Sequence, residues 1–356
     1  MPSYRYLVGE LAPASGNGLR EEIPFSTVKF GHLLNRPGGF EASIGLRHPK
    51  ATRANLDPGR TAIHIERDGV IVWSGILWTA RAKVEDSSLR LGGEGWWSYF
   101  RRRKLRVTKT YAATDQLAIA RDLINYAQGV AGGNVGIVVG AETSGQNRDQ
   151  TWYHYERKNI GQTIEELAGR ANGFDFAIDV AYDTAGTIVK TLVLSYPRRG
   201  RSTPLVWELG TNLEGLGQDV DAYPAANLID AIGAGEGDSM LIATASDPAQ
   251  LATYPLLEDV VTFKDVSVAD TLQGKATLAL ANQAQPIMTI PTLLARQTGP
   301  DTALGTFTTG DTVLVRGEGG WLSVAELMRL VGYDASVDEN GREIVSVALA
   351  QERTMV

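Results

Sequence analysis

The sequence contains no cysteine, which excludes disulfide bonds and thiolate metal sites. Only four histidines are present, and no two of them have the spacing of zinc ligands. No apolar run approaches the ~18 residues of a membrane-spanning helix. The first ten residues lack a basic region followed by a hydrophobic stretch, so we expect no signal peptide. These absences predict a chain made in a reducing cytoplasm, with no metal, no cofactor and no membrane span.

The sequence also lacks a catalytic signature. Glu165 and Glu166 resemble a glycosidase acid–base pair, but they fall near the start of a predicted helix, where acids stabilise the helix dipole. The Gly-rich piece around Glu236 lacks the Lys-Ser/Thr ending of a phosphate loop, and its acids would repel phosphate. A dispersed Ser–His–Asp set leaves no local trace and stays open, although no Gly-x-Ser-x-Gly motif is present. We therefore expect no catalytic residues and a protein that is not an enzyme.

Charge is distributed unevenly along the chain. Residues 1–104 hold 16 Lys+Arg and 10 Asp+Glu, a net charge of +6. Residues 105–200 hold 10 of each, and residues 201–356 hold 8 Lys+Arg and 21 Asp+Glu, a net charge of −13. Such asymmetry governs association rather than fold. It suits either a nucleic-acid binder that uses the basic end or a protein whose opposite ends meet in neighbouring copies.

The clearest local signal lies in residues 61–78, where two apolar runs flank Asp68-Gly69. An Asp-Gly pair between such runs predicts a β-hairpin, because both turn residues must tolerate positive φ. Neither face of this hairpin is purely polar, so we expect it to be covered on both sides. Gly75 in the second strand predicts a bulge or a bend.

The remaining patterns divide the chain into three regions. Short strands between turn-rich clusters predict a small β-sandwich or barrel over residues 1–105. Residues 106–203 are predicted to be an α+β insert, with helices over 115–127 and 160–171 and two strands after them. Residues 204–356 return to strands, with one helix over 268–283 and a final hairpin at Asn340-Gly341. The predicted fold class is mainly β with an α+β insert.

Two aromatic clusters are candidate interfaces. Residues 96–100 precede the run Arg-Arg-Arg-Lys at 101–104, a combination that can stack on bases and contact phosphates. The competing interpretation is a domain edge with packed rings and solvated cations. The cluster at 152–155 could contact sugar faces or a partner protein, although such rings more often pack in cores or interfaces. The candidate interface residues are Trp96, Trp97, Arg101, Arg102, Arg103, Trp152, Tyr153 and Tyr155.

Three features, taken in order, give the chain a family resemblance. The first is the segment 59–78 with its Asp-Gly hairpin. The second is the aromatic and basic block 96–103 followed by the helix at 115–126, and the third is Gly-Asp-Thr-Val-Leu-Val at 310–315 with the closing hairpin after it. In this order they resemble the minor tail proteins of long-tailed (siphovirus) phages of actinobacteria, of the baseplate or tail-tip hub kind.

The resemblance implies a structural virion protein that forms a homotrimer at the distal end of the tail tube. Each subunit would contribute two β-barrel-like tube domains, 1–105 and 204–356, so that three subunits match a sixfold tube. The middle α+β domain would lie toward the tip. The implied partners are the distal tail protein, the tape measure protein and other tail-tip or fibre proteins, with DNA passing only in transit.

Three alternatives remain open at this point: a distal tail protein forming a hexameric ring, a tail-associated enzyme that degrades cell wall or glycans, and a nucleic-acid binder using residues 101–104. The opposite charges of the two ends suggest that the first barrel of one subunit faces the last barrel of the next. Charge complementarity of this kind sets register more than it adds affinity.

Overall fold

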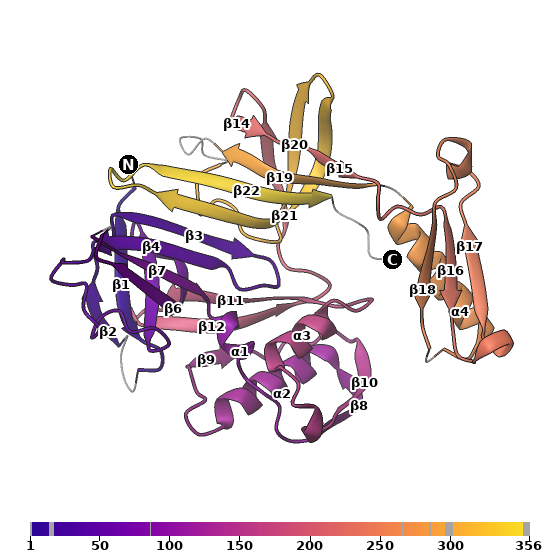
Figure 1. Cartoon of the computed structure of the whole chain (residues 1–356), viewed down its shortest axis with the longest axis horizontal. Helices are drawn as coiled ribbons and strands as arrows, with labels where there is room; N and C mark the ends of the chain where they lie inside the picture. Colours follow the sequence, from indigo (N-terminus) through magenta and orange to yellow (C-terminus); the bar gives the residue numbers. More distant parts are fainter. Residues whose placement is uncertain are drawn as a thin grey trace.

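The computed structural model describes residues 2–13, 18–85, 87–264, 266–284, 286–295 and 302–351. Strands dominate this part of the chain, and two of its three helices longer than four residues lie in the middle region, so the predicted mainly β fold with an α+β insert is confirmed. No helix in the described ranges combines the length and the hydropathy of a membrane span. Figure 1 shows the N-terminal strands and the last strands side by side, with the insert below them.

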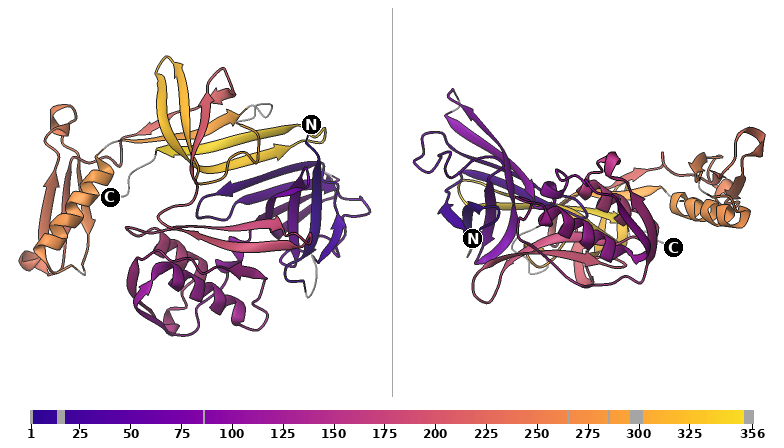
Figure 2. Two further views of the ribbon diagram at one scale, coloured as in Figure 1. Left: turned by 180° about the vertical axis from the view of Figure 1, so that it is seen from behind. Right: turned by 90° about the horizontal axis from the view of Figure 1, so that it is seen from below.

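The N-terminal region is a strongly curved antiparallel sheet in the order β3-β4-β7-β6-β5-β1-β2 (Figure 2). Buried and exposed residues alternate along β4, with Phe40 and Ile44 inward and Glu41 outward. The strands are β1 (Tyr4–Glu10), β2 (Leu19–Glu22), β3 (Thr27–Leu33), β4 (Gly39–Gly45), β5 (Thr61–Arg67), β6 (Val70–Lys83) and β7 (Ser88–Gly95).

The predicted hairpin joins β5 to β6, and Asp68 and Gly69 adopt φ values of 50° and 83°. Six of the seven residues of β5 are buried, so the hairpin is covered on both sides as expected. Of the bulge or bend predicted at Gly75, the bulge is wrong, because the register of β6 shifts at Val72 and Trp78 instead. The bend stays a prediction. A Cβ on Gly75 would lie 2.3 Å from the carbonyl oxygen of Glu94 and 2.5 Å from the ring of Trp73. The glycine is needed because two backbones approach closely here.

The insert follows without a break. Asp115 caps α2 by accepting hydrogen bonds from the backbone N–H groups of Leu117 and Ala118. One face of this helix is buried, including Leu117, Ala120 and Ile124, and the second helix ends at Ala168, three residues before the predicted end. Strands β8 and β10 form a small sheet that the sequence patterns did not reveal. The elements are α1 (Trp97–Phe100), β8 (Lys109–Asp115), α2 (Gln116–Gly129), β9 (Ile137–Val139), β10 (Asn147–Trp152), η1 (His154–Glu156), α3 (Ile160–Ala168), β11 (Asp175–Tyr182) and β12 (Ile188–Ser195).

The last third of the chain is joined to the first third by backbone hydrogen bonds between strands. Strand β21 pairs antiparallel with β3, so that Ala335 lies opposite Phe30 and Val337 opposite Val28. The described strands of both ends thus form one 14-stranded sheet, and their buried side chains form one continuous core. The C-terminal strands of this sheet are β13 (Ser202–Glu208), β14 (Leu213–Leu216), β15 (Asp219–Asp221), β19 (Ile287–Ala295), β20 (Thr312–Gly319), β21 (Leu322–Val337) and β22 (Glu343–Gln351).

Residues 228–283 form a small unit of their own, which we call the appended unit. The three-stranded sheet β17-β16-β18 is covered on one face by α4, whose Leu272 and Ala276 pack against Ile229 and Ala231. Figures 1 and 2 show this unit standing apart from the rest of the chain. The sequence predicted its helix but not its separation. Its elements are β16 (Leu228–Ile232), η2 (Gly237–Ser239), β17 (Ile242–Ser246), η3 (Gln250–Ala252), β18 (Glu258–Thr262) and α4 (Ala269–Gln283).

Candidate functional site

Three parts of the chain meet at Asp175, a buried carboxylate at the start of β11. The side chain of Asn35, in the β3–β4 turn, donates a hydrogen bond to it at 2.7 Å, and the backbone N–H of Arg199 donates another at 2.7 Å. Arg329 of β21 forms an ion pair with the same carboxylate. A buried carboxylate needs such partners to offset its lost hydration. Asp175 therefore joins the N-terminal sheet, the insert and the last third.

A second set of polar contacts crosses from the N-terminal strands to β22. Arg67 Nε lies 2.8 Å from Glu343 Oε2, and the hydroxyl of Tyr4 donates to the same carboxylate. Burial, followed by the hydrogen bond to Glu343, raises the pKa of Tyr4. Lys29 and Asp334 pair across β3 and β21 at 3.6 Å. Cations of the first third and acids of the last third thus already meet within one chain.

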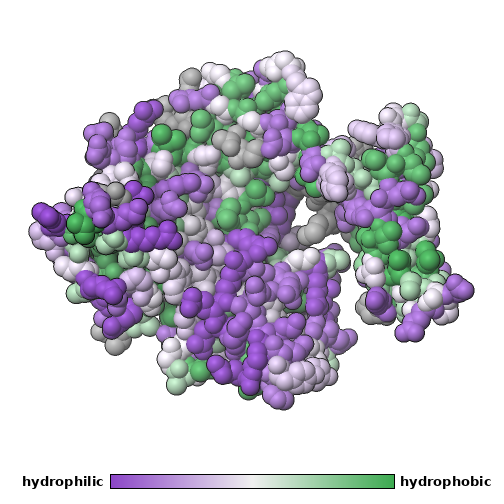
Figure 3. Space-filling view, viewed as in Figure 1, coloured by the Kyte–Doolittle hydropathy of each residue, from purple (hydrophilic) through white to green (hydrophobic). Residues whose placement is uncertain are grey.

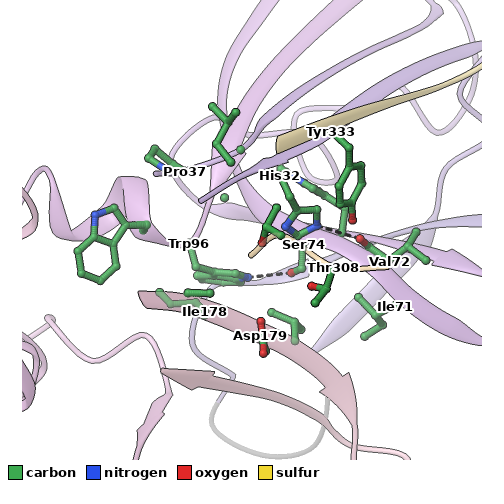
Figure 4. A pocket seen from close by; sticks show the side chains of 18 of the residues that line it. His32, Pro37, Ile71, Val72, Ser74, Trp96, Ile178, Asp179, Thr308 and Tyr333 are labelled. Carbon is green, nitrogen blue, oxygen red and sulfur yellow. Dashed lines mark hydrogen bonds between the residues drawn. The ribbon is translucent and has the colours of Figure 1, made fainter. Parts of the chain in front are cut away.

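A cavity of about 330 Å³ lies beside this junction. Figure 4 shows His32 and Tyr333 on one side of it and Trp96, Ile178 and Asp179 on the other. His32 Nε2 lies 3.0 Å from the carbonyl oxygen of Val72, and its ring centroid is 5.2 Å from that of Tyr333. Burial lowers the pKa of His32 and raises the pKa of Tyr333, so both rings are neutral at pH 7.

A serine–histidine contact also borders the cavity. Ser74 Oγ lies 2.9 Å from His64 Nδ1 and accepts a hydrogen bond from the indole N–H of Trp96 at 2.8 Å. Burial, followed by the charge of Lys190, lowers the pKa of His64 to about 3. An imidazole with so low a pKa is a poor base for activating a serine. We interpret the contact as core packing. Within the described ranges, no group of three or more His, Asp or Glu residues could hold a metal ion.

The aromatic candidates from the sequence separate into two groups. Trp96, Trp97 and Trp152 are buried in the cluster of side chains that forms the core of the insert. Tyr153 and Tyr155 are 47% and 67% exposed, and their rings stack at a centroid distance of 5.2 Å with an interplanar angle of 7°. Of the five aromatic candidates, Tyr153 and Tyr155 are the two whose rings a partner could contact.

The basic candidates are engaged within the chain. Arg101 forms a two-pronged ion pair with Glu165 at 2.6 and 2.8 Å. The guanidinium of Arg102 lies 5.0 Å from the ring centroid of Trp78, and Arg103 donates to the carbonyl oxygen of Ala127 at 3.1 Å. Arg101 and Arg103 are poorly placed to neutralise phosphates, whereas Arg102 and Lys104 are exposed, so only half of the basic run at residues 101–104 is open to a nucleic acid.

The residues that hold the three parts together were missed at the sequence level. Asn35 left a local signal in the sequence, because it begins a turn-rich cluster, and its φ of 58° in the structure agrees with a turn. Asp175, Arg329, Arg67 and Glu343 left none, since their partners lie more than a hundred residues away. Charged residues in strands look alike in a sequence whether they face solvent or a buried counter-ion.

Comparisons with solved structures place this geometry among phage tail proteins. No protein-family model and no curated protein matches the sequence. The tail protein from Neisseria meningitidis matches with a TM-score of 0.65 at 17% identity, covering 98% of this chain and 97% of that one. The 43 kDa tail protein of prophage MuSo2 from Shewanella oneidensis matches with a TM-score of 0.67 at 11% identity, and the match covers 98% of both chains. The prophage tail protein gp18 from Listeria monocytogenes matches with a TM-score of 0.59 at 13% identity, and the match covers 98% of this chain and 95% of that one.

At these identities the likeness shows the fold. The chain has, over nearly its whole length, the fold of phage tail proteins. The matched proteins come from prophages and bacteria of several groups, so the likeness does not select the siphoviruses of actinobacteria that the sequence resembles.

Proposed function

We propose that this protein is a structural, non-enzymatic component of the phage virion, the homotrimeric hub of the tail tip. The observation that carries the proposal is the end-to-end likeness to phage tail proteins. Three copies would each present two β modules, residues 1–105 and 204–356, and so match a sixfold tail tube while allowing DNA to pass. The insert, residues 106–203, would lie toward the tip.

The arrangement of the two β modules supports this role. They lie edge to edge in one sheet, fixed by the β3–β21 pairing and by the buried pair of Arg67 and Glu343. Two modules joined in this way suit a closed ring, because ring closure needs a defined angle between successive contacts. The partners we infer are the distal tail protein, the tape measure protein and other tail-tip or fibre proteins. Tyr153 and Tyr155, exposed on the insert, are the contact residues we retain.

The test is the symmetry and composition of the assembled protein. Native mass spectrometry of the full chain should give three copies, and averaged electron micrographs should show a threefold ring around an opening wide enough for duplex DNA. Six copies in a sixfold ring would favour a distal tail protein. If the protein stays monomeric at every concentration tested, alone and with tail-tube protein, the hub proposal is wrong.

A further inference from the structure

The appended unit has one sheet face that α4 does not cover. Ile232 pairs with Ile242, and Asp230 pairs with Val260 and Thr244, which places these side chains together on the face away from the helix. Ile242 is 59% exposed and Val260 is 55% exposed. Figure 3, seen from the same side as Figure 1, shows hydrophobic residues gathered over β16, β17 and β18. An uncovered sheet face on which large apolar side chains stand exposed among polar ones is a candidate interaction surface.

The charge of the appended unit restricts what can cover that face. Residues 228–283 contain eight Asp+Glu and two Lys, a net charge of −6. This is nearly half of the net negative charge of residues 201–356. Asp230 and Glu258 lie on the open face itself, among its apolar side chains. A partner must therefore offer cations beside apolar groups, since a second acidic surface would be repelled.

The same chain carries a surface of that description at its other end. A groove of about 880 Å³ runs across the outer side of β3, β4, β7 and β6 and past the turn before β22. Five cations and two acids line it, and its apolar side chains include Ile344, which is 45% exposed. At the tip of the β6–β7 hairpin beside it, Val84 is 73% exposed. The five cations of this basic groove are Lys29, Arg81, Lys83, Arg90 and Arg342.

These two surfaces cannot meet within one molecule. Figure 1 places the N-terminal strands and the appended unit at opposite ends of the longest axis. A contact between them is heterologous, head to tail, and repeats from one copy to the next until it closes a ring. That is the geometry which a hub of several copies requires.

We propose that the open face of the appended unit, centred on Ile242 and Val260, docks into the basic groove of a neighbouring copy of this chain. The inference rests on the proposed assembly into several copies and adds the surface that joins them. Apolar contact supplies the cohesion, and Asp230 and Glu258 facing Arg81 and its neighbours set the orientation.

The first experiment weighs the full chain in solution by mass photometry and sedimentation. The double substitution of Ile242→Asp with Val260→Asp should lower the association constant at least tenfold and leave the circular dichroism spectrum unchanged. Val268→Asp is the matched control, because Val268 is 59% exposed and precedes α4, away from the open face. The control should assemble as the parent chain does.

A charge-exchange pair then tests the partner without adding acids to an apolar face. Glu258→Lys and Arg81→Glu should each weaken assembly, and the two together in one chain should restore it, since each copy then again presents opposite charges across the contact. An intact trimer in both the double Asp variant and the charge variants overturns this surface and leaves the hub proposal standing. A parent chain that never assembles overturns both.

Discussion

Arg67 and Glu343 lie 276 residues apart in the sequence and form an ion pair in which Nε and Oε2 are 2.8 Å apart. The Glu343 side chain is 3% exposed and that of Arg67 is 17% exposed. The pair links the last residue of β5 to the first residue of β22, and so connects the first and last thirds of the chain. Together with the β3–β21 pairing, this pair joins the two β modules directly.

Removing one member of this pair should destabilise the fold. Glu343→Ala should lower the free energy of unfolding by about 3 kcal/mol, because Tyr4 would lose its acceptor and Arg67 would keep only the half-exposed Asp68, 3.5 Å away, as a counter-ion. Urea unfolding of the full chain, followed by tryptophan fluorescence, measures the loss. Arg53→Ala is the control, because Arg53 pairs with Asp57 while its side chain is 85% exposed, and should cost less than about 1 kcal/mol. Equal losses in the two variants would show that the junction between the two β modules does not depend on this pair.

Gly75 provides a second test, of close backbone approach. Gly75→Ala would drive a methyl group into the carbonyl of Glu94 and the ring of Trp73, and should cost about 1–3 kcal/mol. Gly45→Ala is the control, because open space surrounds that position, and should be neutral or slightly stabilising. Thermal unfolding of the two variants compares them directly. A melting temperature of Gly75→Ala at or above that of the parent chain would contradict the packing described here.

The buried His64 makes stability depend on pH. Its folded pKa of about 3 lies below the ordinary value near 6.5, so the unfolded chain takes up the proton first as pH falls. The contribution of neutral His64 is complete above about pH 6.5 and is lost toward pH 3, at about 1.4 kcal/mol per pH unit. His64→Gln should flatten this dependence, whereas His154→Gln, at an exposed position, should leave it unchanged. An unaltered slope in His64→Gln would mean that other groups carry the effect.

The aromatic candidates should differ sharply when truncated. Trp97→Ala should cost about 3–5 kcal/mol, because the ring is buried and packs against Phe176 at a centroid distance of 4.2 Å. Tyr155→Ala should change the free energy of unfolding by less than about 0.5 kcal/mol, as is usual at exposed positions. Guanidinium unfolding distinguishes the two. A large loss in Tyr155→Ala would mean that the stacked tyrosines serve the fold rather than a partner.

Elements with a short-range cause could be predicted from the sequence. The hairpin at Asp68-Gly69 formed because that pair accepts positive φ, and α2 began at Asp115 because its carboxylate caps the first turn. The mainly β class followed from strand spacing and turn chemistry in the same way. The three candidate tryptophans, Trp96, Trp97 and Trp152, could be recognised as residues for packing or binding, but their spacing did not predict that all three are buried.

The sequence by itself determined the local elements, the mainly β class and the opposite charge of the two ends. Only the tertiary structure decided that β21 pairs with β3, that Asp175 gathers three distant segments, and that residues 228–283 leave the main sheet as a separate unit. The physical reason is range. Turns and caps depend on dihedral preferences within a few residues, whereas strand edges and buried charges take their partners from wherever the folded chain brings them.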